Sequence, residues 1–311
     1  MKRISVIGFM MVFAACVQAA NGNWMTGLPD TLQVCRVSIP GTHDSGTSGV
    51  WFPMRHYART QSMDLAEQWD AGIRFFDLRP KLEGDRLKIY HGPANCHLTF
   101  QDALLILKQK LDEHPTEFCI VMTNSAGGGR KAVDMTMEQI LQFIPSRMLA
   151  VFRPDMTVAD IRGRILFIHR NEPSAGTDIP GCITHGWPGN GMFQGAQLVS
   201  SNRETATLWV QDCYTSGNNE SDAYLDNKWK MMEHLLDIFP QADEKVWCIN
   251  HASGYTGTGV STNIKNNARN TNARLLEYLG NHKGPIGIVP MDFPQQDLID
   301  AIIFLNTFAA E

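Results

Sequence analysis

Short runs of apolar and β-branched residues recur along the chain and constrain its fold more than any other feature. The eight runs are CRVSIPG, IRFFDLR, LKIYHG, FCIVMTN, RILFIHR, TLWVQD, VWCINH and IGIVPMDF. Amphipathic helical patterns lie between several of them, such as Leu104, Leu107 and Leu111 on one face of QDALLILKQKLDE. Strands that alternate with helices form a parallel sheet, and eight such strands predict a closed barrel.

Two intervals depart from a regular barrel. The segment KLEGD, between FDLRP and KIYHGP, has the composition of a hairpin turn and leaves no room for a helix. The stretch 173–203 is rich in glycine and proline, and we expect a long loop on the active face of the barrel. The predicted fold is therefore α/β, a single distorted or incomplete (β/α)8 TIM-type barrel over residues 20–311.

The N-terminal segment has the features of a secretory signal. It has a basic start, an apolar run over 4–15 and small residues near position 19, which predict a signal peptide over residues 1–19. A second interpretation is a lipoprotein box, FAAC, with Cys16 as the lipidated residue; Phe13 is unusual at the first box position, so cleavage near Ala19 is favoured. We expect an exported protein that is secreted, periplasmic or a surface lipoprotein.

Charge and cysteine content exclude several classes of protein. The net charge is −5 and no run of Lys and Arg forms a basic stripe, so we expect no nucleic-acid partner. No Cys-x-x-Cys motif occurs, which argues against zinc. The cysteines beyond the signal segment are too few for a disulfide scaffold, and Cys119 and Cys248 lie in apolar runs where buried free thiols are expected.

The apolar runs end in groups that can do chemistry. These groups are His43 and Asp44, Asp77 and Arg79, His91, Asn124, His169 and Arg170, Asp212, Asn250 and His251, and Asp292. In a parallel barrel the carboxyl ends of the strands open on one face, which carries the active site. We therefore expect these side chains to surround one site.

A base, an acid and a cation in such a site are suited to phosphodiester cleavage. A neutral His43 can remove a proton from an attacking hydroxyl, while a protonated His91 donates one to the leaving oxygen. Arg79 can hold the phosphate oxygens as charge develops in the transition state. Asp44 and Asp292 can each orient a histidine.

Other interpretations use the same residues. Two histidines and an aspartate could bind zinc, and Asp44, Asp77 and Asp292 could bind calcium or magnesium. Arg79 argues against a metal, because it is a fixed cation on the strand face that carries Asp77. His43 and Asp44 could instead form a capped turn, and Asp292 could be the N-cap of the helix in PQQDLIDAII. Asp77 and the arginine two residues on could be a structural ion pair.

Four motifs carry a resemblance to a known family. The segments SIPGTHDSGT, GIRFFDLRP, YHGP and MDF resemble the bacterial phosphatidylinositol-specific phospholipases C, in this order and at similar separations. The resemblance implies a distorted, calcium-independent barrel that cleaves phosphatidylinositol to diacylglycerol and inositol 1,2-cyclic phosphate. It implies no cofactor, and the implied partner is phosphatidylinositol at a membrane surface. We expect a monomer with no stable protein partner.

The resemblance also implies roles for the catalytic residues. His43 matches the base that deprotonates the inositol 2-hydroxyl, and Asp292 matches its orienting carboxylate. His91 matches the acid that protonates the leaving oxygen, with Asp44 as its partner. Arg79 matches the arginine that replaces calcium on the phosphate.

Substrate contacts are implied in the same way. Arg170, Asp212 and Tyr214 match inositol contacts, the last as a ring under the sugar, and Trp187 and Asp77 are assigned to substrate binding with them. The familiar bacterial enzymes have a lysine pair where this chain has VMTNSAGGGR, so a cationic hydroxyl contact is missing unless Arg130 reaches back.

Two other functions remain open from the sequence. One is a metal-dependent glycerophosphodiester phosphodiesterase, and the other is an inactive barrel that binds inositol lipids or glycans. Free phosphatidylinositol, a glycosylated anchor lipid and a soluble phosphodiester are all possible substrates. Residues of the types of Trp51, Phe52, Trp187, Met192 and Phe193 are more often core than membrane contacts. If they are exposed around the mouth of the barrel, they would form a rim that contacts lipid headgroups.

Overall fold

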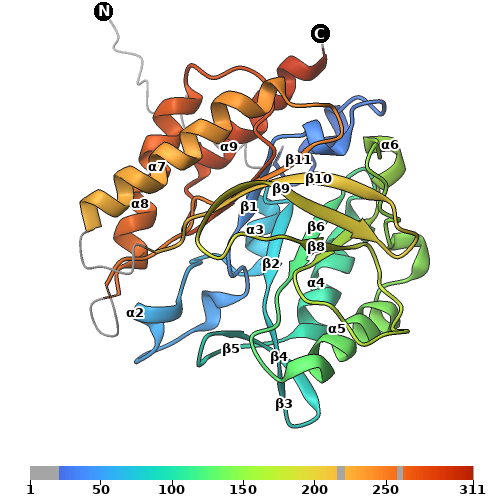
Figure 1. Cartoon of the computed structure of the whole chain (residues 1–311). Coiled ribbons are helices and arrows are strands. Elements are labelled where there is room, and N and C mark those ends of the chain that lie inside the picture. The colour runs from blue at the N-terminus through green and yellow to red at the C-terminus, as the bar shows by residue number, and fades with distance from the viewer. Residues whose placement is uncertain (1–20, 216–220, 258–261, 311) are drawn as a thin grey trace, which may run out of the picture.

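The computed structural model describes residues 21–215, 221–257 and 262–310. The predicted signal segment and Cys16 lie outside these residues. Figure 1 shows a barrel with helices packed around it and a small sheet, β3 to β5, at one edge.

A closed barrel forms the centre of the molecule. Its strands, in spatial order, are β1 (Ile39–Thr42), β12 (Ile288–Met291), β11 (Trp247–Asn250), β10 (Thr205–Asp212), β9 (Gly191–Ser200), β8 (Cys182–His185), β7 (Ile165–His169), β6 (Cys119–Thr123) and β2 (Phe75–Leu78). All neighbours pair in parallel except β9, which is antiparallel to both β8 and β10. The predicted α/β barrel is confirmed, with this antiparallel strand as its main distortion.

The segment LKIYHG was predicted to be a barrel strand, and that prediction is wrong. It forms β4 (Arg86–His91), the middle of an antiparallel sheet with β3 (Pro80–Glu83) and β5 (Ala94–Thr99), outside the barrel. The predicted hairpin turn between β3 and β4 is present, with Gly84 at a positive φ of 63°. So short a connection can only join antiparallel strands, because a parallel partner needs a long crossover.

The stretch 173–203 was predicted to be a long loop, but it supplies two barrel strands. β8 and β9 both lie within it, and β9 forms a long hairpin with β10 across the barrel (Figure 1). Much of β9 is exposed on one face, and Phe193 on that strand is 47% exposed. A half-exposed strand tolerates glycine and polar residues, so its composition resembles that of a loop.

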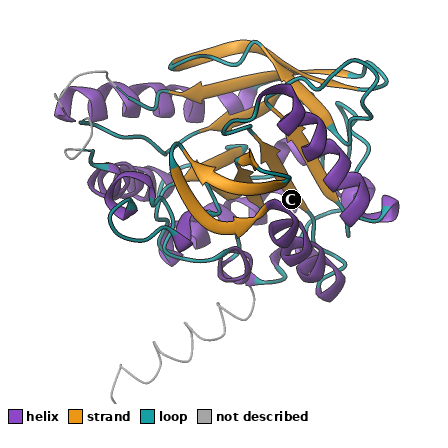
Figure 2. Ribbon diagram, turned by 90° about the horizontal axis from the view of Figure 1, so that it is seen from below, coloured by secondary structure: helices purple, strands orange, loops and turns teal. Residues whose placement is uncertain are grey.

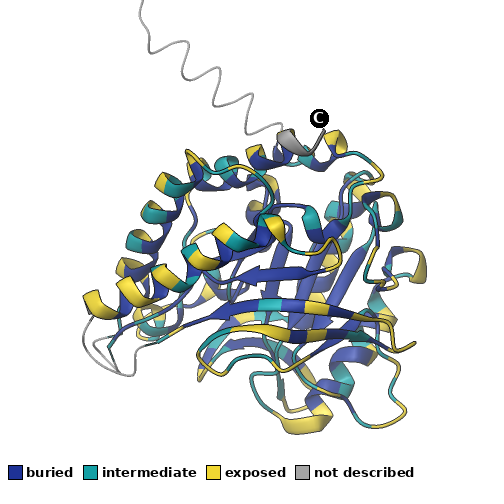
Figure 3. Cartoon of the chain, turned by 45° about the horizontal axis from the view of Figure 1, so that its top comes forward, coloured by how far each residue is buried: buried dark blue, intermediate teal, exposed yellow. Residues whose placement is uncertain are grey.

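Helices pack around much of the barrel, and Figure 2 shows them on several sides of the strands, while the long strands at the upper edge of that view have no helix over them. The α-helices are α2 (Arg55–Ala58), α3 (Leu65–Ala71), α4 (Phe100–Glu113), α5 (Gly129–Phe143), α6 (Val158–Ile161), α7 (Ser221–Ile238), α8 (Ile264–Leu279) and α9 (Gln296–Phe304). The predicted face of α4 is buried, since Leu104, Leu107 and Leu111 are at most 1% exposed. Figure 3 shows the same division, with buried strands inside and exposed residues on the outer helix faces.

Arg74 closes the amino-terminal end of the barrel just before β2. It is fully buried, its Nε and Nη2 donate to Glu117 Oε2 at 3.0 and 2.9 Å, and its guanidinium lies 4.0 Å from the ring centroid of Trp69. Its remaining donors reach the backbone oxygens of Trp69, Ile73, Asn21 and Gly22. This arginine therefore ties the first described residues to the barrel.

The described cysteines carry no disulfide. Cys35, Cys96, Cys119, Cys182, Cys213 and Cys248 are all free and buried. The expectation of buried free thiols at Cys119 and Cys248 is confirmed. Within the part of the chain that the structure describes, no helix has both the length and the apolar character needed to cross a membrane.

Candidate active site

A cavity of about 590 Å³ opens at the carboxyl ends of the barrel strands. Most of the site residues expected from the sequence line it: His43, Arg79, His91, Arg170, Asp212, Tyr214 and Asp292. Asn124, at the end of β6, also lines the cavity. The structure thus brings together residues from both ends of the chain.

His43 and Asp292 meet because their strands are neighbours. β1 pairs with β12 so that Thr42 lies opposite Met291, and the next residue on each strand enters the site. His43 Nδ1 lies 2.8 Å from Asp292 Oδ1, which is the pairing expected from the sequence. Asp292 does not cap the next helix, because the N-cap of α9 is Gln295.

Gln61 was not identified from the sequence, although it fixes this pair of strand ends. It is fully buried, and its Nε2 donates to the backbone oxygens of His43 and Met291 at 2.7 and 2.8 Å. The side chain therefore bridges β1 and β12 directly beneath the predicted base. It lies in a short loop, RTQSM, that has no periodic pattern, so nothing in the sequence marked it.

Arg79 is held by two carboxylates. Its Nε lies 2.9 Å from Asp44 Oδ1, and its Nη2 lies 3.0 Å from Asp77 Oδ2. Burial disfavours the charged form of Arg79, but Asp44 and Asp77 outweigh burial and raise the pKa of Arg79 above its ordinary value. For Asp77, the nearby charges of Arg79 and His43 overcome burial and lower its pKa to about 2. The arginine is therefore a fixed cation in the wall of the cavity.

The assignment of Asp77 to substrate binding needs correction. Its side chain is 0% exposed and does not line the cavity. Oδ2 accepts hydrogen bonds from Arg79 and from the backbone N–H of Asp44. Asp77 is thus placed to hold the arginine rather than to contact a bound molecule.

Arg79 also reaches the predicted base. Its Nη2 lies 2.8 Å from His43 Nε2, and because a guanidinium only donates, Nε2 is the acceptor in this conformation. In this contact the ring is neutral, with its proton on Nδ1 toward Asp292, and protonation of Nε2 would remove the acceptor and break the contact with Arg79. Burial disfavours the imidazolium, but the carboxylates of Asp292 and Asp44 outweigh burial and raise the pKa of His43 to about 9.

His91 faces His43 from the hairpin outside the barrel. The two ring centroids are 6.2 Å apart and the rings are nearly perpendicular. His91 Nδ1 lies 2.8 Å from the backbone oxygen of Ala58, and its Nε2 lies 3.6 Å from Asp44 Oδ2. The sequence assigned Asp44 to His91 alone, but the same Oδ2 is also 3.2 Å from His43 Nε2. Asp44 therefore lies between the two histidines.

A second group of side chains forms the opposite wall. Arg170 Nη1 lies 3.6 Å from Asp212 Oδ2, and the indole Nε1 of Trp187 donates to the same oxygen at 2.8 Å. The guanidinium of Arg170 lies 4.2 Å from the ring centroid of Trp187. Burial alone would raise the pKa of Asp212, but His251, Trp187 and Arg170 lower it.

Two aromatic assignments have different outcomes. Tyr214 lines the cavity, is 38% exposed and stacks with Tyr255 at a centroid distance of 6.3 Å. Trp187 does not line the cavity, so its assignment as a direct substrate contact needs correction. Because its indole is directed to Asp212, it is placed to orient that carboxylate.

The suggestion that Arg130 replaces a missing lysine is not supported by its position. Its Nη1 donates to the backbone oxygens of Glu172 and Pro173 at 3.3 and 2.6 Å, and the side chain does not line the cavity. No lysine lines the cavity among residues 21–215, 221–257 and 262–310. Asn124 is the polar group on that side.

One cluster has the composition of a metal site. Ligand atoms of His43, Asp44 and Asp77 lie within 4.8 Å of one another. Arg79 already contacts all three of these residues, at 2.8 to 3.0 Å. A metal ion would have to displace that guanidinium, because two cations cannot share such short distances in a buried site. The residues as arranged fit an arginine better than a metal.

Comparisons with known proteins agree with this fold. No model of a protein family matches the chain. The chain is 28% identical to a 1-phosphatidylinositol phosphodiesterase of Listeria monocytogenes, over 92% of this chain and 85% of that protein. It is 25% identical to a protein of the same name from Staphylococcus aureus, over 91% of this chain and 94% of that protein.

Solved structures give the same result. The phosphatidylinositol-specific phospholipase C of Listeria monocytogenes superposes with a TM-score of 0.73 at 24% identity, covering 92% of this chain and 98% of that one. The F249X mutant of the Staphylococcus aureus enzyme superposes with a TM-score of 0.77 at 21% identity, covering 91% and 99%.

Proposed function

The chain is a homologue of the bacterial phosphatidylinositol-specific phospholipases C over most of its length, and we propose that it cleaves phosphatidylinositol to diacylglycerol and inositol 1,2-cyclic phosphate. One observation carries the proposal: His43 and His91, each beside a carboxylate, line one cavity together with Arg79, which Asp44 and Asp77 hold. A base, an acid and a phosphate-binding cation are the three groups that such a cleavage requires.

In the first half of the reaction, His43 is the base. Its Nε2 takes the proton of the inositol 2-hydroxyl as that oxygen forms a bond to phosphorus, and Asp292 at 2.8 Å stabilises the imidazolium that results. Arg79 donates to Nε2 in the present structure, so the bound phosphate must draw this guanidinium toward its own oxygens first. Substrate binding would then free the base and neutralise the phosphate in one movement.

In the second half, His91 is the acid. Its Nδ1–H donates to the Ala58 oxygen, so Nε2, which faces Asp44, is the nitrogen from which a proton can be given to the leaving oxygen. The bond from phosphorus to the glycerol oxygen breaks, and the Nε2 proton moves to that oxygen. The products are neutral diacylglycerol and the cyclic phosphodiester, with one proton gained by His43 and one lost by His91.

The inositol ring is proposed to lie between the catalytic groups and the opposite wall. Arg170 and Asp212 can donate to and accept from its hydroxyl groups, and Tyr214 offers an aromatic face. Asn124 is neutral, and the described cavity lining holds no lysine. This wall therefore favours a head group without extra phosphates.

Metal independence is part of the proposal and rests on charge. Arg79 occupies the space between Asp44 and Asp77 and supplies the positive charge that a metal ion would otherwise bring to the phosphate. We therefore propose that chelators leave the reaction unchanged.

Contact with a membrane surface is proposed through exposed aromatic residues. Trp51 is 65% exposed and Phe52 is 83% exposed, in the loop that follows the first strand end, and Phe193 is exposed on β9. Exposed aromatics suit the headgroup region of a bilayer. Changing Trp51 and Phe52 to Ala should weaken cosedimentation with phosphatidylinositol vesicles.

The basic start, the apolar run and the small residues within 1–19 support export of the protein. We further propose that the protein is a monomer.

The proposed reaction is tested with phosphatidylinositol in the presence of a chelator, followed by phosphorus NMR. We expect a cyclic phosphate to appear, and we expect His43→Ala and His91→Ala each to lower turnover by about 10²–10⁴-fold while circular dichroism stays unchanged. Appreciable activity in either variant would contradict the assignment. Inositol-lipid binding without any turnover would instead indicate an inactive barrel.

A second candidate is a metal-dependent glycerophosphodiester phosphodiesterase, which is favoured only by the cluster of His43, Asp44 and Asp77. It predicts activity that is lost with chelator and restored by calcium or magnesium, with no cyclic product. The same NMR experiment therefore separates the two candidates.

A further inference from the structure

Lys228 is a buried cation that the proposed chemistry does not use. It lies on α7, is 1% exposed, and its Nζ donates to the backbone oxygens of Cys213 and His251 at 2.9 and 2.8 Å. Within the described residues, no carboxylate oxygen lies within 4.0 Å of Nζ. Lysine is almost never fully buried without a charged partner, so this arrangement calls for a reason.

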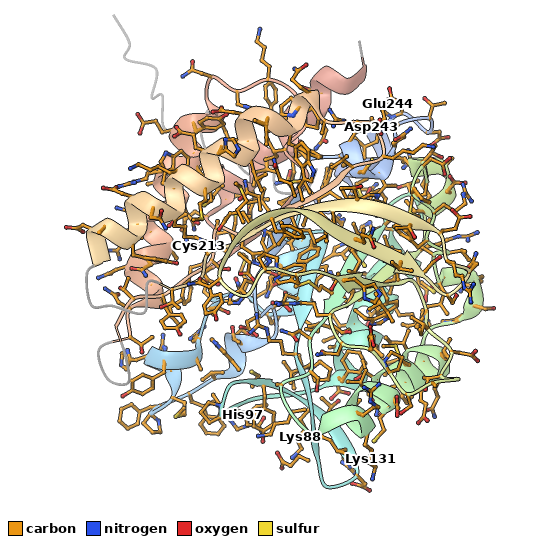
Figure 4. All side chains as sticks on the ribbon, viewed as in Figure 1. Lys88, His97, Lys131, Cys213, Asp243 and Glu244 are labelled. Carbon is orange, nitrogen blue, oxygen red and sulfur yellow. The ribbon has the colours of Figure 1, made fainter. Side chains whose placement is uncertain are left out.

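The two carbonyl groups belong to neighbouring strand ends. Cys213 directly follows β10 and His251 directly follows β11, and these strands pair in parallel. Figure 4 labels Cys213 where the end of β10 approaches the helices α7 and α8. A single ammonium group therefore joins two adjacent barrel strands at the end that carries the cavity.

Each carbonyl has a second, neutral donor. Tyr224, one turn before Lys228 on α7, donates its hydroxyl to the Cys213 oxygen at 2.9 Å. Gln211 Nε2 donates to the His251 oxygen at 2.7 Å. The lysine is thus the charged member of a set of hydrogen bonds that fixes both strand ends, and Tyr224 is its matched neutral neighbour.

The residues beside these carbonyls form the wall proposed to bind inositol. Cys213 lies in sequence between Asp212 and Tyr214, which both line the cavity. The ring of His251 lies 6.1 Å from that of His43 and 5.8 Å from that of Trp187. A shift of either carbonyl would therefore move groups that face the sugar.

The charge on Lys228 is balanced by its surroundings. The titratable groups that face it are Asp212 and Cys213 from the β10 end, His251 from the β11 end, Asp292 from the β12 end and Tyr224 from its own helix. Burial lowers the pKa of Lys228 to about 8, although Asp212, Cys213 and Asp292 favour the charged form. The ammonium is therefore expected to lose its proton under mildly alkaline conditions.

We propose that Lys228 is a positioning residue that holds the inositol-binding wall in place, and that it does so as the ammonium, so that sugar binding weakens when the proton is lost. The proposal rests on the proposed function of the cavity. A neutral amine still has two N–H groups, but bonds from a charged donor to a carbonyl are roughly twice as strong. Loss of the charge also removes a cation that faces Asp212 and Asp292, and leaves Arg170 beside the first and His43 beside the second.

The test uses the soluble probe myo-inositol with the whole chain. Its Kd is measured by NMR titration at pH 7 and pH 9.5 for the wild type, for Lys228→Met and for the control Tyr224→Phe. We expect the wild type to bind about tenfold more weakly at pH 9.5. Lys228→Met should bind weakly at both pH values, and Tyr224→Phe should keep the pH dependence because it keeps the charge. In turnover of phosphatidylinositol, Lys228→Met should raise KM more than it lowers kcat.

Several results would overturn the proposal. These are wild-type affinity in Lys228→Met, no weakening of wild-type binding between pH 7 and 9.5, or an equal loss in Tyr224→Phe. If Lys228→Met does not fold, Lys228→Arg replaces it: this variant keeps its charge at pH 9.5, so it should lose the part of the pH dependence that comes from position 228, whereas any part that comes from His43 remains. Failure of the proposed function gives a different result, because the wild type would then release no cyclic phosphate. If the wild type is active and Lys228→Met binds inositol with wild-type affinity, only the role of this lysine is contradicted.

Discussion

The two ends of β2 each carry an arginine, and the two arginines are used differently. Arg74 precedes the strand, is 0% exposed, and donates to Glu117 and to surrounding backbone oxygens. Arg79 follows the strand, has a side chain that is 21% exposed, and is held by Asp44 and Asp77 beside an open cavity. One strand thus separates an arginine whose partners all belong to the protein from one that can still bind an anion.

The difference shows that charged groups have different roles at the two ends of the barrel. At the amino-terminal end, Arg74 pairs with Glu117 and donates to the backbone oxygens of residues 21 and 22, so that it holds this segment against the barrel. At the carboxyl end, two carboxylates hold one arginine and position it without using all of its donors. Charge at the first end serves stability, and charge at the second serves chemistry, which matches the general distinction between the two faces of such barrels.

The largest expected effect comes from changing Arg79 to Gln, which removes the cation at the open end. Because the phosphate would lose its charged donor, we expect kcat to fall by about 10³-fold, as measured by release of cyclic phosphate. The change also leaves the buried carboxylates of Asp44 and Asp77 without their cation, so the midpoint of urea unfolding should fall as well, and kcat is therefore measured per folded molecule. A wild-type kcat in the folded variant would remove the distinction between the two arginines.

Changing Arg74 to Met should have the opposite result. It leaves the carboxylate of Glu117 buried without its partner, which is expected to cost about 3–5 kcal/mol of the free energy of unfolding. Urea denaturation measures this loss, and kcat per folded molecule should stay at the wild-type value. The double variant Arg74→Met with Glu117→Leu is the control, since removal of both charges should restore much of the stability. A fall in kcat of the folded variant would contradict a purely structural role.

The sequence predicted the open end of the barrel better than its walls. The pairing of His43 with Asp292 was implied by the resemblance to the bacterial phospholipases C, and the structure gives its physical reason, because the first and last strands of the closed barrel are neighbours. The position of β4 could not be predicted, because an apolar run has the same local pattern in a hairpin as in a barrel strand.

Buried polar residues were the hardest to interpret. Asp77 lies on the site face of its strand, but only the packing around Arg79 shows that it points away from the cavity. Lys228 occurs in NKWKMM, where a lysine is expected to lie on the exposed face of a helix. Its burial depends on contacts with two distant strand ends, which no local pattern encodes.

The smallest expected effect concerns Asp292, which lies at the same carboxyl end of the barrel as Arg79 and pairs with His43. Asp292 helps to raise the pKa of His43 to about 9, above its ordinary value, so Asp292→Asn should lower that pKa. A raised pKa means that the stability from the charged pair is complete below about pH 6.5 and is lost as pH rises through 9. The variant should therefore be less stable than the wild type at pH 6, and this difference should shrink by pH 10.

The acid limb of kcat/KM should also move to lower pH in Asp292→Asn, because the neutral form of His43 is reached at a lower pH. The maximum rate should fall, because the orienting carboxylate is lost. NMR titration of the His43 ring measures the shift directly, and an unchanged or raised pKa in Asp292→Asn would show that Asp44 alone controls the base.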